Sequence, residues 1–118
     1  MATHNDLGKR GEDIAIEYLL KKGHRIIARN YWYQKAEVDI ISSCEDMIIF
    51  TEVKTRSTDR YGYPEEAVSD KKKEKLREAM DHYLIESNIK EESRFDIISI
   101  VINTKGIDVH HIEDAFYH

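Results

Sequence analysis

Proline, glycine and cysteine are scarce in this chain, and each scarcity argues against a class of structure. One proline and five glycines among 118 residues leave little material for a flexible linker, so we expect a single domain spanning residues 1–118. The only cysteine, Cys44, cannot form a disulfide within the chain, which favours a reducing compartment. The amino terminus lacks the apolar core of a signal peptide, so we expect a cytoplasmic protein.

Long hydrophobic runs and an excess of positive charge are also missing. The apolar runs are only a few residues long, far below the roughly 20 residues of a membrane-spanning helix, so we expect no membrane partner. The net charge of −5 argues against a broad positive field that holds nucleic acid. Positive charge does cluster locally, at residues 54–60 and 71–77. Binding to nucleic acid is therefore expected to be weak, metal-dependent and sensitive to salt.

The spacing of apolar residues predicts an α/β fold. A helix is predicted over residues 6–22, where Gly8 and Gly11 lie on or beside the apolar face and are expected to let the helix approach a sheet closely. Further elements are predicted as strands over 24–33, 36–42 and 47–55, a polar loop over 57–64, a helix from an N-cap at Ser69, and strands over 94–102 and 106–112. A strand, a long crossover helix and a strand normally make a parallel connection, so we expect a mixed sheet.

Acidic residues occur at two predicted strand ends in a pattern that suggests a metal site. Glu37 and Asp39 open one strand and share a face, because side chains alternate along a strand. Glu52 and Lys54 close the next strand and share a face there. A hairpin through residues 42–46 would bring these three acids and one base together. Because unneutralised carboxylates are costly in a partly buried site, we expect a bound cation, and oxygen ligands favour Mg²⁺, Mn²⁺ or Ca²⁺.

These side chains suit the hydrolysis of a phosphodiester, which needs an activated water and stabilisation of charge on phosphorus. Asp39 and Glu52 are the predicted metal ligands, and Glu37 is counted with the catalytic group. Lys54 is expected to orient the water or to stabilise the phosphoryl oxygens. Glu12, at the border of the first helix's apolar face, is expected to point into the same cleft. Taken alone, Glu52 and Lys54 also fit an exposed strand face that carries a salt bridge, so the prediction depends on the combination.

The same residues resemble the pattern of a known family. A helix acid at Glu12, then Asp39, then Glu52-x-Lys54 is similar to the PD-(D/E)xK phosphodiesterases, the restriction-endonuclease-like superfamily that includes archaeal Holliday-junction resolvases. More closely, the chain resembles the YraN family of bacterial proteins, also called UPF0102. The matching segments run nearly end to end and include residues 8–12, 29–30, 37–41, 50–56, 94–96 and 115–116.

The resemblance implies a restriction-endonuclease-like αβββαβ core, with a mixed sheet flanked by helices. Its implied site has Asp39 and Glu52 as metal ligands, Lys54 as the catalytic lysine and Glu12 as a supporting acid. It also implies Mg²⁺ or Mn²⁺ as the cofactor, and DNA rather than RNA as the partner, with branched or otherwise non-duplex DNA leading. Because resolvases cut two strands with two sites, the resemblance allows a homodimer. Ala36 departs from the family's usual glycine, which puts in doubt any need for close substrate approach at that position.

Further residues are candidates for substrate contact. The predicted substrate-binding residues are Arg56, Arg60, Tyr61 and Lys72. Lys72 lies one turn before the apolar Leu76 and could reach a phosphate, although a lysine in a first helical turn is mildly unfavourable. The aromatic run at residues 31–33 could stack on unpaired bases, but aromatic residues in strands more often pack a core.

Three charged or titratable residues are assigned no chemistry. Asp96 is expected to be structural, paired with Arg94 or with a neighbouring strand. His110 and His111 alternate faces of a strand and lack acid or cysteine partners at metal-binding spacing, so they are interpreted as incidental.

Two other functions stay open at this point. One is a nucleic-acid-binding or adaptor module on a nuclease fold with little or no hydrolysis, which the acidic net charge favours and the intact set of Asp39, Glu52 and Lys54 disfavours. The other is a metal-dependent hydrolase of small phosphate esters, for which the sequence offers no glycine-rich loop.

Overall fold

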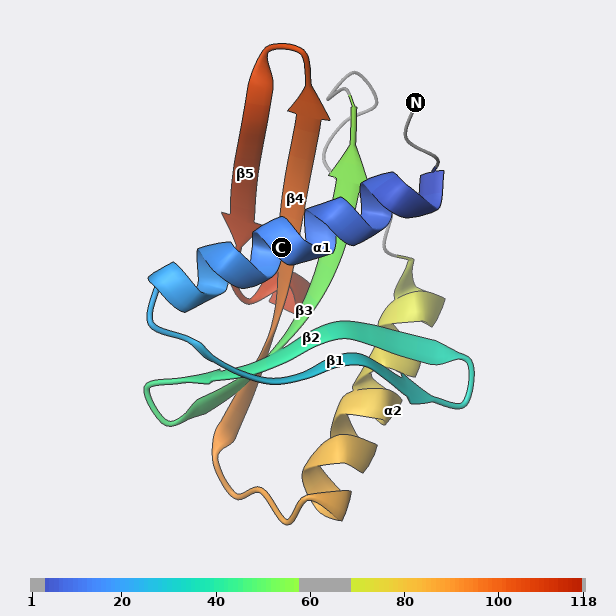
Figure 1. The fold of residues 1–118 in the computed structure, drawn as a ribbon. Helices are drawn as coiled ribbons and strands as arrows, with labels where there is room; N and C mark the ends of the chain where they lie inside the picture. The colour runs from blue at the N-terminus through green and yellow to red at the C-terminus, as the bar shows by residue number, and fades with distance from the viewer. Residues whose placement is uncertain (1–3, 58–68, 118) are drawn as a thin grey trace.

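A computed structural model describes residues 4–57 and 69–117 as an α/β fold with one mixed sheet. The elements in chain order are α1 (His4–Lys21), β1 (Arg25–Tyr33), β2 (Ala36–Cys44), β3 (Met47–Arg56), α2 (Asp70–Glu86), β4 (Glu92–Asn103), β5 (Gly106–Ile112) and a short 3₁₀ helix, η2 (Ala115–Tyr117). Figure 1 shows the β1–β2 hairpin crossing the long strands β3 and β4. The predicted order of helix, three strands, helix and two strands is confirmed.

The five strands lie in sequence order, β1-β2-β3-β4-β5. Strands β3 and β4 are parallel, and the other neighbouring pairs are antiparallel. The parallel pair is joined through α2, so the predicted mixed sheet is confirmed. The turn between β2 and β3 is tight: Glu45 and Asp46 have φ angles of 51° and 62°, the left-handed conformation that a two-residue type I′ hairpin turn requires.

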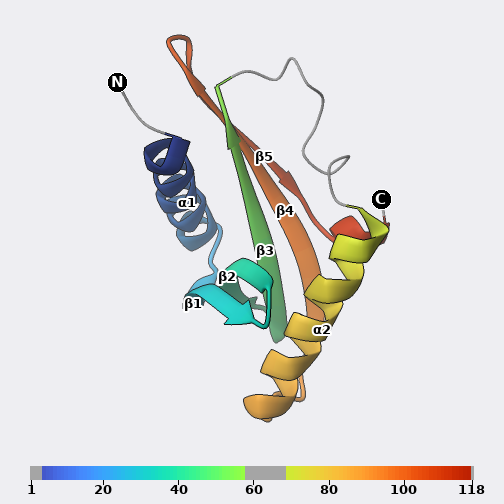
Figure 2. The same cartoon turned by 90° about the vertical axis from the view of Figure 1, so that its right-hand side faces the viewer.

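The two helices cover opposite faces of the sheet (Figure 2). On one face, α2 packs Leu76 and Ala79 against Phe50 and Phe95. On the other face, α1 packs Ala15 and Leu19 into a second cluster with core residues of β2 and β4. Strand β4 supplies buried side chains to both clusters, as its continuous apolar run predicted.

Local signals in the sequence set the ends and the approach of the helices. The hydroxyl of Ser69 accepts a hydrogen bond of 3.2 Å from the backbone N–H of Lys72, so the predicted N-cap of α2 is confirmed. Gly11 lies against Thr55 of β3: a Cβ built at Gly11 would fall 1.8 Å from the Thr55 hydroxyl oxygen, so no side chain fits. Gly8 has nothing within 4 Å of such a Cβ, and the expected close approach there is wrong. Within the described part of the chain, no helix has the length and apolar character needed to cross a bilayer.

Candidate active site

An open cleft of about 390 Å³ lies between the β1–β2–β3 hairpins and the amino-terminal half of α2. The residues that line it are Trp32, Lys35, Ala36, Glu37, Asp39, Glu52, Val53, Lys54, Lys72, Lys75 and Leu76. Three acids and four lysines therefore meet in one hollow. The predicted convergence of Glu37, Asp39, Glu52 and Lys54 is present in the structure.

Strand alternation on β3 places Glu52 and Lys54 on the side of the cleft. Phe50, two residues before Glu52, belongs to the core cluster under α2, so Glu52 and Lys54 continue along that face. The intervening Val53 packs in the cluster under α1. The buried run that fixes Phe50 in the core thus also aims the two functional side chains.

Asp39 is held where β2 and β3 stop pairing. The antiparallel ladder ends at Ile40 and Thr51, and one further step would place Asp39 opposite Glu52. Instead, the backbone N–H of Val53 donates a hydrogen bond of 2.7 Å to Oδ2 of Asp39. A carboxylate thus accepts the hydrogen bond at the point where the two strands separate, which fixes its position beside Glu52.

The environment of Asp39 disfavours its charged form. Burial raises the pKa of Asp39, and a hydrogen bond from the Val53 backbone partly offsets this effect. A side-chain hydrogen bond with Glu37 and the charges of Glu37 and Glu52 raise it further, so that the pKa reaches about 7. Positive charge added to the cleft would therefore stabilise the ionised form of Asp39.

Glu52 is buried and only half satisfied. Its Oε1 accepts a hydrogen bond of 2.6 Å from Lys72 Nζ and lies 3.4 Å from Lys54 Nζ. Its Oε2 is buried and has no hydrogen-bond partner. Burial by itself lowers the pKa of Lys72, but the hydrogen bond and charge of Glu52, with the charge of Asp39, leave that pKa above its usual value. A buried carboxylate oxygen without a partner costs free energy, so the site is organised for a further positive or donor group.

The donor set fits a hard divalent cation. Asp39 and Glu52 offer carboxylate oxygens, one of them without a partner, in a cleft open to solvent. Among residues 4–57 and 69–117, no group of three or more acid, histidine or cysteine side chains is gathered closely enough to hold a metal ion alone. Mg²⁺ is commonly bound by only one or two carboxylates, with water and substrate phosphates completing the shell, so two protein ligands suffice for this class of ion.

The structure does not bring every predicted residue into the cleft. Glu12 lies on α1, and its carboxylate accepts hydrogen bonds of 3.3 Å from Arg29 and 3.1 Å from Asn30. It is not among the described residues that line the cleft, so the expected convergence of Glu12 is not seen. Arg56 is the last residue of β3, two positions after Lys54. Arg60 and Tyr61 lie outside the described residues.

Three residues of the cleft wall were not among the predicted site residues, although base stacking was considered for the aromatic run at residues 31–33. Trp32 lies directly opposite Glu37 in the β1–β2 register, and Lys35 follows in the turn between these strands. Lys75 comes from α2, one turn after Lys72. The hairpin register was a usable signal for Trp32, because directly opposed residues share a face. The position of Lys75 depends on how α2 docks, which no local pattern reveals.

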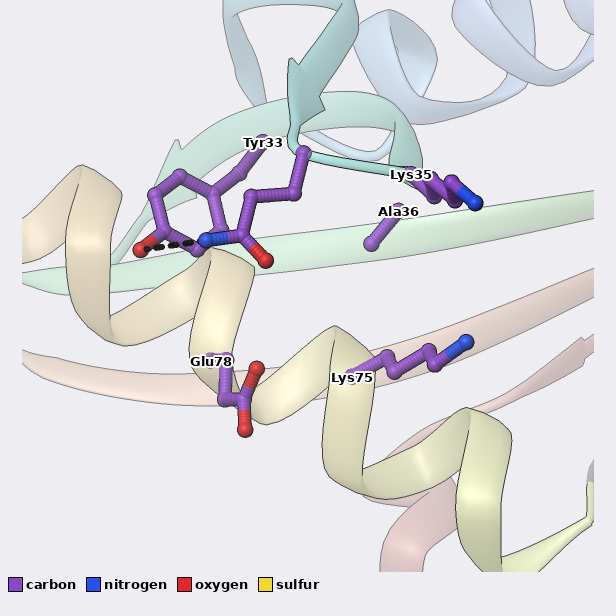
Figure 3. A pocket seen from close by; sticks show the side chains of 6 residues that line it. Tyr33, Lys35, Ala36, Lys75 and Glu78 are labelled. Carbon is purple, nitrogen blue, oxygen red and sulfur yellow. Dashed lines mark hydrogen bonds between the residues drawn. The ribbon is translucent and has the colours of Figure 1, made fainter.

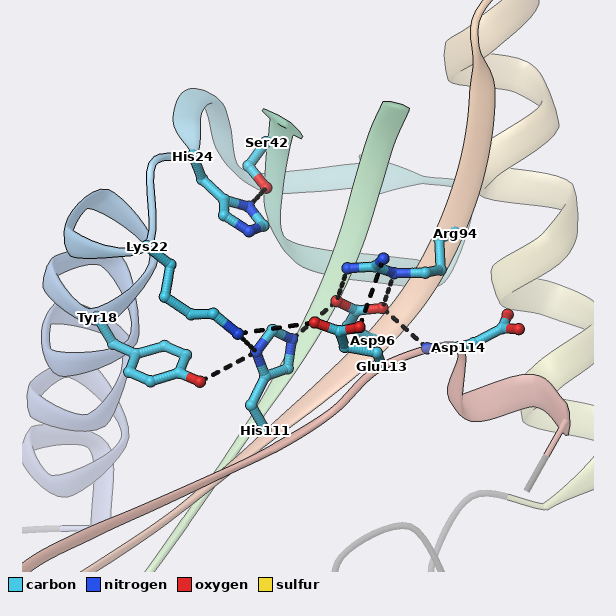
Figure 4. Close-up of polar contacts among 9 residues, drawn as sticks. All are labelled: Tyr18, Lys22, His24, Ser42, Arg94, Asp96, His111, Glu113 and Asp114. Carbon is cyan, nitrogen blue, oxygen red and sulfur yellow. Dashed lines mark hydrogen bonds and ion pairs between the residues drawn. The ribbon is translucent and has the colours of Figure 1, made fainter. Parts of the chain in front are cut away.

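A second polar cluster links α1, β4 and β5 away from the cleft (Figure 4). Asp96 is fully buried and is held by Arg94 in two contacts of 2.8 and 2.9 Å, by His111 Nε2 at 2.8 Å and by the Asp114 backbone N–H at 3.1 Å. Burial raises the pKa of Asp96, but the hydrogen bonds from His111, Arg94 and Asp114 outweigh it and hold the pKa below its usual value. The predicted pairing of Asp96 with Arg94 is confirmed.

The interpretation of His111 as incidental is wrong. Its Nε2 contacts Asp96, and its Nδ1 lies 3.2 Å from the Tyr18 hydroxyl and 3.4 Å from Lys22 Nζ. His111 therefore connects β5 to α1 through one ring. Its acid partner lies 15 residues earlier on the adjacent strand, which a search for short metal-binding spacings does not detect.

Comparison with known proteins identifies relatives over the whole chain. The sequence model described as "Uncharacterised protein family UPF0102" matches residues 11–100. A UPF0102 protein of Christiangramia forsetii is 48% identical over 118 residues, which cover 100% of this chain and 99% of that protein. A UPF0102 protein of Flavobacterium psychrophilum is 46% identical with the same coverage. One of Clostridioides difficile is 42% identical over 115 residues, 97% of this chain and 99% of that protein.

Proposed function

The chain belongs to the UPF0102 family, and we propose that it is a nuclease that uses a divalent metal ion, Mg²⁺ or Mn²⁺, to hydrolyse phosphodiester bonds in DNA. The observation that carries the proposal is the pairing of a buried, half-satisfied Glu52 with a desolvated Asp39 in one open cleft. Isolated buried acids are costly, and a cation between them offsets that cost. The resemblance to PD-(D/E)xK enzymes points to the same residues.

The proposed division of labour follows from the contacts. Asp39 and Glu52 would hold the ion, which supplies charge stabilisation at the phosphate and a more acidic water for attack. Lys54 extends from the same strand face as Glu52 and places an ammonium group 3.4 Å from Oε1, beside the ion's ligand. It stabilises negative charge on the phosphoryl oxygens. Glu37 lines the same cleft and raises the pKa of the Asp39 carboxyl, so it acts through Asp39 as a positioning residue.

Lys72 gives the site a second ammonium group from the opposite wall. In the structure this group neutralises Oε1 of Glu52 at 2.6 Å. When the negative charge of a phosphate and the positive charge of a metal ion enter together, Lys72 is free to turn from Glu52 to the phosphate, because its stem is flexible and its nitrogen lies in the cleft wall. This is the role that the sequence predicted for it as a substrate-binding residue.

The decisive experiment combines metal binding with cleavage. Mn²⁺ is titrated calorimetrically into the native protein, Asp39→Ala and Lys54→Met, and each protein is incubated with Mn²⁺ and plasmid, single-stranded and four-way-junction DNA. We expect Asp39→Ala to lose both metal binding and cleavage. Lys54→Met is expected to keep metal binding and to lose cleavage by roughly 100-fold or more, in line with the loss of one positioned charge-stabilising donor.

The matched control is Lys105→Met, an exposed lysine in the turn between β4 and β5, purified identically. It should cleave as the native protein does, which separates the protein's activity from a contaminating nuclease. Cleavage that survives in Asp39→Ala, or native protein that binds no Mn²⁺, would overturn the proposal. Light scattering of the protein with each of these DNA forms gives its oligomeric state. This measurement tests the homodimer that paired strand cutting would require.

A second candidate function is a nucleic-acid-binding or adaptor module without hydrolysis. The observation that favours it is the Lys72–Glu52 ion pair, because a lysine already neutralises part of the charge that a metal ion would neutralise. The net charge of −5 points the same way. Metal binding without cleavage of any of the three DNA forms is the result that favours the module.

A further inference from the structure

Trp32 is a large apolar side chain exposed beside the acid cluster. Its exposed fraction is 60%, although it lines the cleft that contains Glu37, Asp39 and Glu52. An exposed tryptophan in isolation needs no explanation, because single apolar residues are common on surfaces. Here its position is specific, since Trp32 and Glu37 are directly opposed in the β1–β2 register and so share the cleft face.

The strand that carries Trp32 is fixed by its two aromatic neighbours. The Tyr31 hydroxyl lies 2.8 Å from His82 Nδ1 on α2, and the Tyr31 ring meets Tyr83 edge to face at 5.2 Å. The Tyr33 ring stacks on the His82 ring at 4.2 Å. Two tyrosines therefore anchor the end of β1 to α2, while Trp32 between them stays exposed at the cleft. The indole is displayed by a rigid element, which favours specific contact.

Positive charge flanks the indole. Lys35, from the β1–β2 turn, and Lys75, from α2, line the same cleft as Trp32. Both also line an adjoining hollow of about 200 Å³ with Tyr33, Gln34, Ala36 and Glu78. Figure 3 shows their side chains extending in the same direction from the two walls. Within the described residues neither ammonium group is paired with a carboxylate, so both are available to an anion.

We propose that Trp32 is a stacking platform for an unpaired nucleobase, with Lys35 and Lys75 contacting the backbone phosphates on either side of it. The inference rests on the proposed phosphodiesterase site and names its substrate class: a strand with an unstacked base next to the phosphate in the cleft. A flat aromatic ring beside lysines is the combination that binds single strands, because every base has a face that can stack. In the interior of a duplex both faces of a base are already covered, so only a duplex end or an unpaired base can use this platform.

An exposed tryptophan is also a common anchor in contacts between proteins. The surroundings of Trp32 favour nucleic acid. Its neighbours in the cleft are four lysines and an acid pair suited to a phosphate-bound cation, whereas protein contact surfaces are depleted of lysine and acidic residues at their centres. Self-association through Trp32 is one of the results that the experiment below distinguishes.

Trp32 is the only tryptophan of the chain, so intrinsic fluorescence reports on this position alone. A 12-nucleotide oligothymidylate is titrated into the whole chain with Ca²⁺, beside an abasic oligomer of the same length and a relaxed, covalently closed circular duplex, which has no ends. We expect the oligothymidylate to quench the fluorescence and the other two to leave it nearly unchanged. A 12-nucleotide oligouridylate in a parallel titration distinguishes DNA from RNA.

Affinities of variants are measured by the anisotropy of a labelled oligothymidylate. Trp32→Ala should weaken binding by about 5- to 150-fold, the loss that one stacked base implies, and Trp32→Phe should restore most of it. Lys35→Met and Lys75→Met should weaken the normal and the abasic oligomer alike, because they contact phosphates. Ile85→Ala, at a side chain that is 79% exposed on α2, is the matched control and should bind as the native protein does.

Three results would overturn the inference. They are equal affinities for the normal and abasic oligomers, a Trp32→Ala variant with native affinity, and a Trp32→Ala variant whose only defect is lost self-association. These results are separable from failure of the proposed nuclease, since binding is read without cleavage. Trp32-dependent binding with no cleavage of any DNA would remove the nuclease and leave the base platform standing. Cleavage that is independent of Trp32 would remove the base platform and leave the nuclease standing.

Discussion

Lys72 Nζ on α2 lies 2.6 Å from Glu52 Oε1 on β3, a contact that spans 20 residues of the chain. It joins the amino-terminal turn of a helix to the carboxylate proposed as a metal ligand. A cation in a first helical turn is opposed by the helix dipole, and here the buried carboxylate offsets that cost. Lys72 thus supplies, beside Glu52, the positive charge that a bound metal ion would otherwise supply.

Replacing Lys72 with methionine should therefore make the stability of the folded protein depend more strongly on a bound metal ion. The variant keeps much of the aliphatic stem and removes the ammonium group, which leaves Glu52 with Lys54 at 3.4 Å as its remaining partner. We expect the free energy of unfolding to fall by about 1–3 kcal/mol without metal, and the Mn²⁺-induced rise in melting temperature to exceed that of the native protein. Scanning calorimetry with and without Mn²⁺ measures both quantities. Lys71→Met, at an exposed neighbour in the same turn, is the control, and an Mn²⁺ response no larger than native would contradict the prediction.

Asp39 should make the metal-free protein less stable as the pH rises. Burial and Glu37 raise its folded pKa from 3.8 to about 7, so between these values the unfolded chain releases a proton that the folded chain retains. The stabilising contribution of protonated Asp39 is full below about pH 3.8 and is lost as the pH rises through about 7.

An asparagine in place of Asp39 cannot ionise and can still accept the Val53 hydrogen bond. We therefore expect the free energy of unfolding of Asp39→Asn at pH 8 to exceed that of the native protein by an amount on the order of 2–4 kcal/mol. The variant should then unfold at a higher urea concentration. The difference should shrink toward pH 4.5. Urea titrations in EDTA at the two pH values measure this, and a difference that stays constant with pH would refute the pKa argument.

The parts of the site that could be predicted from the sequence are those set by local rules. A hairpin between neighbouring strands and the alternation of side chains place Asp39 near Glu52 and Lys54 without any knowledge of the helices, although the turn is tighter than the predicted residues 42–46. The cap at Ser69 follows from an equally local pattern, and the parallel pairing of β3 with β4 follows from the rule for a strand, a crossover helix and a strand. These features are confirmed in the structure.

The features that sequence reasoning missed depend on how helices dock. Glu12 was expected in the cleft because a helix border residue can face a sheet edge, but α1 covers the opposite face from α2 and its acid pairs with Arg29. Lys75 enters the cleft for the converse reason, as α2 lays its first turns against it. His111 finds Asp96 across an antiparallel pair with α1 closing over both. Each depends on the packing of segments far apart in the chain.

Asp96 should contribute most of the stability of its polar cluster. In Asp96→Asn, the Arg94 guanidinium and His111 lose a fully buried negative partner, and breaking a buried pair in this way costs about 3–5 kcal/mol. Because the folded pKa of Asp96 is depressed, its contribution is present above the ordinary aspartate pKa and is lost as the pH falls through the folded value. The difference between native and variant should therefore narrow in strong acid.

Chemical denaturation at pH 7 and pH 3 measures this contribution. Glu113→Gln is the control, because Glu113 meets Arg94 at 3.7 Å and Lys22 at 3.6 Å with a side chain that is 53% exposed. Surface pairs of this kind contribute about 0–1 kcal/mol. An Asp96→Asn variant that loses no more stability than Glu113→Gln would show that the cluster is not a stabilising unit.

The two glycines of α1 should respond to alanine with opposite signs. At Gly8 a Cβ meets open space, so Gly8→Ala gains helix propensity and should raise the free energy of unfolding by about 0.5–1 kcal/mol. At Gly11 a Cβ would lie 1.8 Å from the Thr55 hydroxyl oxygen and 2.7 Å from both Cβ and Cγ2 of Thr55. The same propensity gain is then outweighed by overpacking, and Gly11→Ala should destabilise by about 1–3 kcal/mol.

The clash at Gly11 involves a single side chain, so a second substitution at that side chain should relieve it. Thr55→Gly removes all three atoms that the new Cβ would meet, so Gly11→Ala should cost much less in a Thr55→Gly background than in the native protein. A double-mutant cycle in urea measures the coupling, with Gly8→Ala as the partner that should add independently. A Gly11→Ala penalty that is unchanged when Thr55 is removed would place the cost in the helix itself rather than in the contact between α1 and β3.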